Sequence, residues 1–277
     1  MIPVGIRYIL AASVFFSIMA VLVKSLSGIP VHEIVFFRSL VSGVICLVSL
    51  IRLGIRPWGN QRRLLLLRGL FGTGALLSFF YTLQVAPLAT AVTIQYLSPV
   101  FTALFAAIFL KERLHPMQIA CFALAMAGVV VIKGFDPRVS LEVVFWGVLS
   151  AACAGMAYTL VRKLRESDTA LVVVFYFPLV TVPLVGPYTF AHWKAPEPNE
   201  WGMLLSIGVV VTFAQIFLTK AFQTEKAATV SIFRYLGTIY AMLFGWFLFG
   251  ETIPVMSLVG MALIVVGVLL STRFRYT

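Results

Sequence analysis

The sequence predicts an all-α, polytopic membrane protein whose ten transmembrane helices form two inverted five-helix repeats. Three observations lead to this prediction. Of the 277 residues, 61% are hydrophobic and only 11% are charged, whereas a soluble globular chain carries about 25% charged residues. The chain also contains ten apolar runs of membrane-spanning length, and it matches itself at a constant offset of 139 residues. A soluble fold has no way to cover so much apolar surface, so a lipid bilayer is the expected solvent.

Each predicted helix is a run of about 20 mainly apolar residues, the length that crosses a bilayer. Only helices are expected, because every backbone polar group in lipid must be satisfied within its own segment. Turn signals such as Ala86-Pro87 and His115-Pro116 separate the runs. The first run has no small-residue cleavage site after it, so we expect it to be retained as a helix. In order, the runs are 5–25, 33–52, 65–85, 88–110, 115–133, 142–162, 169–188, 201–221, 227–249 and 254–272.

The distribution of basic residues predicts the orientation of these helices. With the N-terminus placed in the cytoplasm, four basic residues lie on the opposite side, and Arg38 and Arg234 fall inside helices. This positive-inside bias predicts a multi-pass protein of the bacterial inner membrane with both termini cytoplasmic. It also explains the net charge of +11 without nucleic acid, as a rim that faces lipid headgroups and solvent. The other 15 of the 21 basic residues lie at cytoplasmic ends: Arg7, Arg52, Arg56, Arg62, Arg63, Arg68, Lys111, Arg113, Arg162, Lys163, Arg165, Lys220, Lys226, Arg273 and Arg275.

The internal match divides the chain into a first repeat, 1–138, and a second repeat, 139–277. Because each repeat has five helices, an odd number, the second must cross the membrane in the opposite sense to the first. Inverted repeats of this kind are a recurring plan of secondary transporters, with the substrate bound near the midplane between the halves. The informative matches pair Lys24 with Lys163, Ala89-Thr90 with Ala228-Thr229, Tyr96 with Tyr235, and Glu112 with Glu251.

Two stretches carry a resemblance to a known family. They are Pro87 to Leu114 and Lys226 to Ile253. Each has an Ala-rich start, a polar or proline break near the middle of the helix, and a Leu/Phe-rich end followed by a glutamate. With Phe37-Arg38 in the second helix, they make the chain resemble the EamA-type transporters of the drug/metabolite transporter superfamily over its whole length. The resemblance implies a ten-helix carrier with a central cavity lined mainly by the first, third, fourth, sixth, eighth and ninth helices. It also implies an organic solute as substrate, such as an amino acid, a vitamin or a nucleotide-type metabolite.

Arg234 is the sharpest candidate for substrate binding, because a charge at depth in a membrane usually faces a cavity or a partner. Its forked donors suit a carboxylate, but it could instead pair with Glu225 or extend towards the cytoplasmic rim. Its repeat partner is Gln95, so the two halves differ at this place and specificity is expected there. Tyr96 and Tyr235 follow these residues, where they could stack on a substrate or pack between helices.

Other residues are assigned weaker or different roles. We expect Arg38 to be structural or gating, and Ser98-Pro99 to kink the fourth helix, either as a hinge or as a tolerated bend. The second half has Gly237-Thr238 in place of Ser98-Pro99, a departure from the family pattern. Phe16 and Phe80 are candidates for an apolar wall or gate. Further polar candidates for the substrate site, each of which could instead join helices to one another, are Ser17, Thr73, Tyr81, Tyr158, Thr159 and Gln215.

The sequence lacks the motifs of other function classes. No metal-ligand cluster, phosphate-binding glycine loop or nucleophile motif is present, so we expect no cofactor, no metal and no enzymatic activity. The glutamates lie at helix ends and the three histidines in loops, so a proton relay is not expected, and facilitated diffusion or exchange is. We therefore predict a secondary transporter that moves a small anionic or zwitterionic organic metabolite by alternating access, with a monomer plausible. The alternatives are an exporter or exchanger of another organic solute, a channel, or a membrane enzyme.

Overall fold

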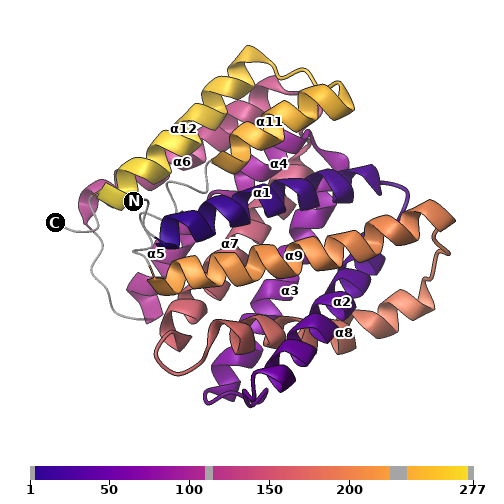
Figure 1. Ribbon diagram of the computed structural model, residues 1–277. Helices are drawn as coiled ribbons and strands as arrows, with labels where there is room; N and C mark the ends of the chain where they lie inside the picture. Colours follow the sequence, from indigo (N-terminus) through magenta and orange to yellow (C-terminus); the bar gives the residue numbers. More distant parts are fainter. Residues whose placement is uncertain (1–3, 110–114, 225–235, 274–277) are drawn as a thin grey trace.

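The computed structural model describes residues 4–109, 115–224 and 236–273, and these residues form helices and no strand (Figure 1). The first half contains α1, α2, α3, α4, α5 and α6, and the second contains α7, α8, α9, α11 and α12. Their bounds are α1 Val4–Ser25, α2 Val31–Arg52, α3 Arg62–Val85, α4 Leu88–Gln95, α5 Ser98–Phe109, α6 Pro116–Phe135, α7 Leu141–Leu164, α8 Ala170–Ala191, α9 Pro198–Thr224, α11 Leu236–Phe249 and α12 Val255–Arg273.

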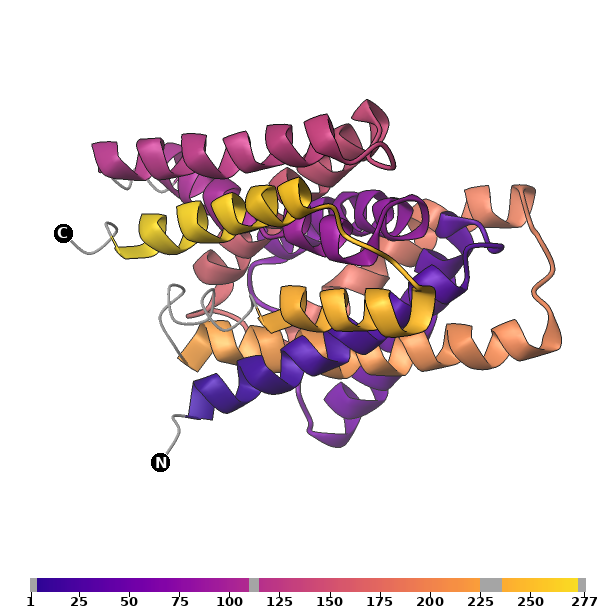
Figure 2. The ribbon, with the colours of Figure 1, turned by 90° about the horizontal axis from the view of Figure 1, so that it is seen from above.

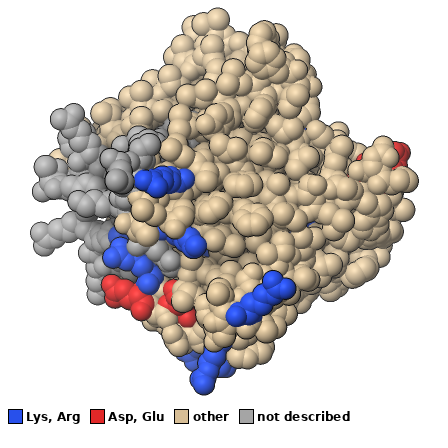
Figure 3. All heavy atoms as spheres, in the orientation of Figure 1, with Lys and Arg blue, Asp and Glu red and all other residues tan. Residues whose placement is uncertain are grey.

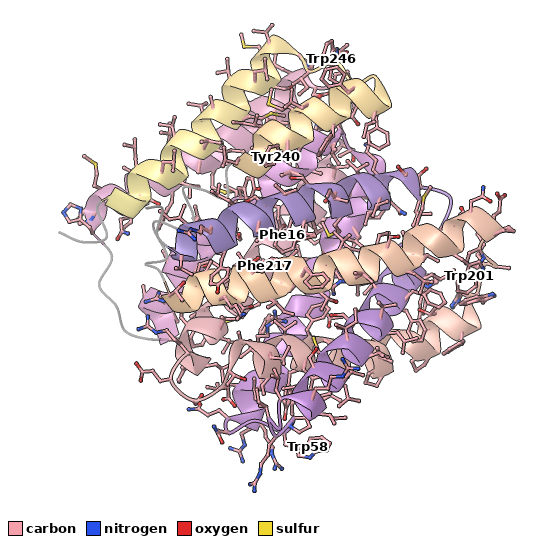
Figure 4. All side chains as sticks on the ribbon, in the orientation of Figure 1. Phe16, Trp58, Trp201, Phe217, Tyr240 and Trp246 are labelled. Carbon is pink, nitrogen blue, oxygen red and sulfur yellow. The ribbon has the colours of Figure 1, made fainter. Side chains whose placement is uncertain are left out.

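The helices have the length and composition of membrane spans. Within the described residues, eight segments are long and apolar enough to cross a bilayer, counting α4 and α5 together as one, and α11 and α12 are shorter apolar helices. Most of the face shown in Figure 3 carries no charged side chain. Trp58, Trp201 and Trp246 lie at the periphery of the bundle (Figure 4), are exposed, and suit the boundary between lipid and water. The predicted all-α polytopic class is confirmed.

The fourth predicted helix is broken where the sequence places Ser98-Pro99. Pro99 has no amide hydrogen, so it cannot donate the helical bond to the Gln95 carbonyl. The chain makes a tight turn instead, in which the Tyr96 and Leu97 amides donate to the carbonyls three residues before them. Thr102 Oγ1 donates to the Ser98 carbonyl over 2.8 Å, which adds a side-chain bond to the first turn of α5. The result is a bend between α4 and α5 inside the bundle.

The helices pack in matched pairs. α1 packs against α9 and α7 packs against α3, while α2 packs against α9 and α8 against α3. Further large contacts join α2 to α8, α5 to α7, and α6 to α12. Figure 2 shows α6 and α12 side by side. A shift of 139 residues converts α2 into α8 and nearly converts α6 into α12, α1 into α7 and α3 into α9. The contacts are thus reciprocal between counterpart helices, and α2–α8 and α6–α12 each join a helix to its own counterpart.

Small residues allow the closest of these contacts. A Cβ placed on Gly260 of α12 would lie 2.7 Å from the carbonyl oxygen of Gly128 in α6, so the two backbones touch with no side chain between them. Gly267 makes a similar approach to Cys121 of α6. In a bilayer, where lipid tails are as apolar as the helices, such small-residue contacts are a main source of helix association. The α6–α12 pair is therefore closely packed, and neither helix contributes to the cavity described below.

Candidate functional site

A cavity of about 120 Å³ lies inside the bundle and is lined by residues of both halves. The helices α1, α3, α4, α7, α9 and α11 contribute to its wall, as does Tyr96 at the break between α4 and α5. α2 and α8 each reach it through one side chain, Arg38 and Phe177. The lining residues of one helix recur at helical spacing, as Arg68, Gly72, Leu76 and Phe79 do on α3, so a single face of each helix is turned to the cavity.

Most of the cavity wall is apolar or has its polar groups already bonded. On α1, Ser17 Oγ donates to the Ser13 carbonyl over 2.8 Å, and Ser13 Oγ donates to the Ile9 carbonyl over 2.9 Å. These hydroxyls have used their hydrogens within their own helix, so towards the cavity they can only accept. Phe16 lies between α1 and α9, near Phe217, in the middle of the bundle (Figure 4). The wall thus favours the apolar body of a solute.

Gln95 and Tyr96 are held at the helix break by contacts with neighbouring helices. Ser150 Oγ of α7 lies 2.7 Å from Gln95 Oε1 and 2.7 Å from the Ala75 carbonyl, which anchors the Gln95 amide at the cavity wall. The Tyr96 hydroxyl lies against Gly237 of α11, where any added methyl group would collide with it. Tyr96 therefore joins the first half to the second at the point where both line the cavity.

The cavity holds two buried arginines that share one aromatic ring. Arg38 of α2 is 1% exposed and Arg68 of α3 is 4% exposed. The Arg38 Cζ lies 4.4 Å and the Arg68 Cζ 5.3 Å from the centre of the Phe177 ring. Gly72 makes room for this arrangement, because a Cβ there would lie 2.8 Å from the ring and 3.1 Å from Arg68 Nη1. Within the described residues, no carboxylate forms an ion pair with either guanidinium.

A polar cluster joins the two halves at the end of the bundle away from the N-terminus. Lys24 Nζ, at the end of α1, lies 2.8 Å from Glu251 Oε1 and donates to the Ala86 carbonyl over 2.6 Å. Glu251 Oε2 accepts from the Leu88 amide over 2.8 Å, where a carboxylate is favoured by the exposed amides at the start of α4. Glu251 reaches this place because α11 ends at Phe249 and the next residue, Gly250, has a φ of 61° that turns the chain back. We call Lys24, Glu251, Ala86 and Leu88 the latch.

A second ion pair lies beside the latch. Asp136, just after α6, is buried, and Arg138 donates to it from its backbone amide, Nε and Nη2 over 2.9–3.1 Å. Arg138 Nη2 also donates to the Thr252 carbonyl over 2.7 Å. Burial alone would raise the pKa of the Asp136 carboxyl, but the hydrogen bonds and charge of Arg138 outweigh it, so the pKa lies below its ordinary value. The pair ties the chain between the halves to the segment that carries Glu251.

The comparison with known proteins decides the family. The model of the EamA-like transporter family matches residues 3–134 and again residues 141–273. The chain belongs to the EamA-like transporter family. Like the members found, it is a transporter of the drug/metabolite superfamily and not an enzyme, and its apolar helices make it a multi-pass membrane protein. The resemblance seen in the sequence is confirmed.

Curated relatives and a solved structure support this assignment along the whole chain. The chain is 32% identical over 274 residues to the pseudopaline exporter CntI of Pseudomonas aeruginosa, covering 98% of this chain and 96% of that protein. It is 31% identical to mouse solute carrier family 35 member G1, covering 95% and 76%. It is 28% identical to the S-adenosylmethionine uptake transporter of Rickettsia prowazekii, covering 89% and 85%. A solved crystal structure with 21% identity, covering 99% of both chains at a TM-score of 0.72, shares the fold.

The structure of this EamA-like transporter brings some of the predicted site residues together and separates others. Arg234 and Tyr235 lie outside the described residues, as does Glu225. Tyr81 lies near the end of α3, where its hydroxyl donates to Glu142 over 2.8 Å. Thr73 is buried against Thr181, and Thr159 bonds the carbonyls of Thr102 and Gly155. Phe80, Ser98 and Pro99 are likewise absent from the cavity wall. The residues that do line the cavity are Ser17, Gln95, Tyr96, Tyr158, Gln215, Phe16 and Arg38.

Two expectations about basic residues were wrong. Arg68 was counted with the charges of the cytoplasmic rim, but it is buried and lines the cavity. Arg38 was placed on a helix not expected to reach the cavity, yet its side chain does. A long arginine near a helix end can extend towards water or fold inward, and the number of residues from the helix end does not distinguish the two. A usable signal was the spacing of Arg68, Gly72 and Phe79, which places all three on one helix face.

Proposed function

We propose that this chain is a secondary transporter that moves a small anionic or zwitterionic organic metabolite across the bacterial inner membrane by alternating access. The two five-helix halves, 1–138 and 139–277, act as inverted repeats that rock about a site between them. Both termini lie in the cytoplasm, and the latch lies at the periplasmic end. The alternative is an exporter or exchanger of another organic solute, such as a vitamin or a nucleotide-type metabolite.

The observation that carries the proposal is a cavity lined by both halves, together with an ion pair that joins those halves at one end of the bundle. Its wall combines apolar surface with two cationic side chains, which suits a solute with an acidic head and an apolar body. Lys24 belongs to the first half and Glu251 to the second, so opening the latched end requires the halves to separate there. Such a site between repeats, with a closure that both repeats build, is what alternating access needs.

The named relatives agree with a small organic solute. Their names describe an exporter of pseudopaline and an uptake transporter of S-adenosylmethionine, so the family moves metabolites in either direction. Within the described residues, each carboxylate of a membrane-spanning helix lies within three residues of its start, as Glu33 and Glu142 do. This placement supports facilitated diffusion or exchange rather than proton transfer through a mid-membrane carboxylate.

The test is counterflow in proteoliposomes loaded with a panel of amino acids, dicarboxylates, vitamins and nucleotides. A carrier accumulates trace radiolabelled solute against an excess of the same solute inside, and its rate saturates. Counterflow with at least one anionic or zwitterionic solute is expected, and Arg234→Ala is expected to reduce it. Unsaturable flux without counterflow would favour a channel, and chemical conversion of the solute would favour a membrane enzyme. Cysteine labelling that placed the two termini on opposite faces would contradict the inverted topology.

A further inference from the structure

Arg38 and Arg68 place two like charges inside the bundle, where burying a charge is energetically unfavourable. Both guanidinium groups are buried inside a membrane-spanning bundle, and both lie close to the ring of Phe177, hence close to each other. A buried charge normally has a partner of opposite charge, because the free energy lost by removing it from water is far larger than the free energy gained from packing. Two cations side by side add their mutual repulsion to that cost.

The surroundings leave the charge of this pair unbalanced. In both arginines, Nε and Nη1 are buried without a hydrogen-bond partner among the described residues. Attraction between a cation and an aromatic face is weaker than an ion pair, and here a single ring serves two cations. The pair is therefore a site at which an anion would supply most of the missing interaction.

Both arginines line the cavity, so an anion in the cavity can reach them. The planar fork of arginine matches the two oxygens of a carboxylate and the edges of a phosphate. The rest of the wall includes Phe16, Phe79 and aliphatic side chains, with Gln95 and Gln215 among its polar groups. The volume of about 120 Å³ is below the roughly 300–1,000 Å³ of sites for drug-sized ligands. The occupant is therefore a compact molecule with one acidic head.

We propose that Arg38, Arg68 and Phe177 form the binding site for the acidic head of a compact organic oxoanion, and that this is the transported solute. Phe177 contacts both guanidinium groups, and the apolar wall receives the rest of the molecule. The assignment rests on the proposed transport function and names the residues of the described structure that select its substrate. It is independent of Arg234.

Ligand-induced stabilisation of the purified protein tests the site without requiring transport. A ligand that binds the folded state raises the apparent melting temperature. The probes are benzoate, its uncharged analogue benzamide, and phenyl phosphate, with the protein in phosphatidylcholine nanodiscs. Benzoate or phenyl phosphate is expected to raise the melting temperature, and the stronger of the two identifies the preferred head. Benzamide, which has the same ring and no charge, is expected to have little effect.

The variants are Arg38→Gln and Arg68→Gln, and the matched control is Arg63→Gln, an exposed arginine of the same helix as Arg68. Loss of one charged donor group is expected to weaken anion binding by about tenfold to a hundredfold, whereas the control keeps wild-type affinity. Without ligand, Arg38→Gln and Arg68→Gln are expected to melt no lower than wild type, because each removes an unbalanced buried charge. A purely structural arginine predicts the opposite, namely lower melting and unchanged binding.

Several outcomes would overturn the site. One is equal benzoate affinity in wild type and both glutamine variants, and another is no response of wild type to either anion. A third is an arginine-dependent response to phosphatidylglycerol alone, which would assign the site to a lipid headgroup. If a glutamine variant does not fold, Arg68→Lys keeps the charge and loses the fork, and unchanged affinity there would count against the proposal. Counterflow distinguishes failure of the proposed site from failure of the proposed transport function. If transport occurs but binding does not depend on the arginines, only the site is contradicted. If binding depends on the arginines but no transport occurs, only the transport function is contradicted.

Discussion

Removing one member of the latch should open the end of the bundle that it closes. Glu251→Gln keeps the shape of the side chain and takes away the charge that faces Lys24 at 2.8 Å. It also weakens the bond from the Leu88 amide, because a neutral oxygen accepts less strongly than a carboxylate. Lys24→Met removes the other charge and the bond to the Ala86 carbonyl. Each variant therefore destabilises the latched state relative to a state in which this end is open.

The size of the effect follows from how buried the pair is. Breaking a fully buried ion pair by removing one partner costs about 3–5 kcal/mol, whereas an exposed pair contributes about 0–1 kcal/mol. The Lys24 and Glu251 side chains are 14% and 11% exposed, so some solvent screening remains, and a cost of about 2 kcal/mol is reasonable. Since about 1.4 kcal/mol corresponds to a factor of ten, the ratio of open to closed molecules should rise about 30-fold.

Cysteine accessibility measures this ratio. Ser17, which lines the cavity, is replaced by cysteine after the three native cysteines have been changed to alanine. A membrane-impermeant maleimide is then added from the latched side. Labelling should be many times faster in Glu251→Gln and Lys24→Met, and the double variant should exceed the single variants by much less than the product of their effects. Lys194→Met is the control, because Lys194 at the same end is exposed and its Nζ donates to the Gly28 carbonyl. Unchanged labelling in both single variants would refute the latch.

Two further predictions concern stability in detergent. Asp136→Asn should lower the apparent melting temperature at neutral pH, because Arg138 loses a buried carboxylate partner, a loss of about 1–3 kcal/mol of folding free energy. The folded-state pKa of Asp136 lies below its ordinary value, so its stabilisation is present above the ordinary pKa and is lost as the pH falls through the folded-state pKa. The melting temperatures of wild type and variant should therefore converge in acid, and a constant difference at all pH values would contradict the pairing. Gly260→Ala should lower the stability of the folded protein by about 1–3 kcal/mol, because the added methyl group overpacks the α6–α12 contact at Gly128. Thermal unfolding measures the effect, with Gly202→Ala, at an exposed glycine, as the control. Equal melting temperatures of the two variants would contradict the prediction.

The fold was predictable from the sequence because its signals are local. An apolar run bounded by proline or charge specifies a spanning helix without knowledge of its neighbours, and the predicted run 33–52 became α2, Val31–Arg52. The break at Ser98-Pro99 was also predictable, because a missing amide hydrogen acts within one helical turn. The placement of charged side chains was not predictable, since Arg68 and Arg63 have the same chemistry and lie in the same helix, α3, yet Arg68 is buried and Arg63 is exposed.

Long-range contacts decided the rest of the site. Tyr81 had the composition of a site residue, but its partner Glu142 lies on a different helix and holds it at the bundle end. Thr73 likewise meets Thr181 across α3 and α8. Neither contact can be read from one helix, because a polar side chain in a membrane helix serves a cavity or a neighbouring helix equally well by sequence. Gln95 and Tyr96 were predicted as the repeat partners of Arg234 and Tyr235, and both line the cavity where the fourth predicted helix breaks.

The internal repeat explains why the oxoanion site is asymmetric. A shift of 139 residues places Arg38 on Phe177, and these two residues face each other where α2 meets its counterpart α8. In the proposed inverted repeat, a residue beside the twofold axis lies next to its counterpart, so an arginine in place of Phe177 would add a third cation beside Arg38 and Arg68. The chain instead has a cation in one copy and an aromatic ring in the other. The counterpart of Arg68 is the buried Ile207, so within the described residues both cations of the cavity come from the first half. A solute bound there meets opposite surroundings at its two ends, which gives two similar repeats the means to hold an asymmetric molecule in one orientation.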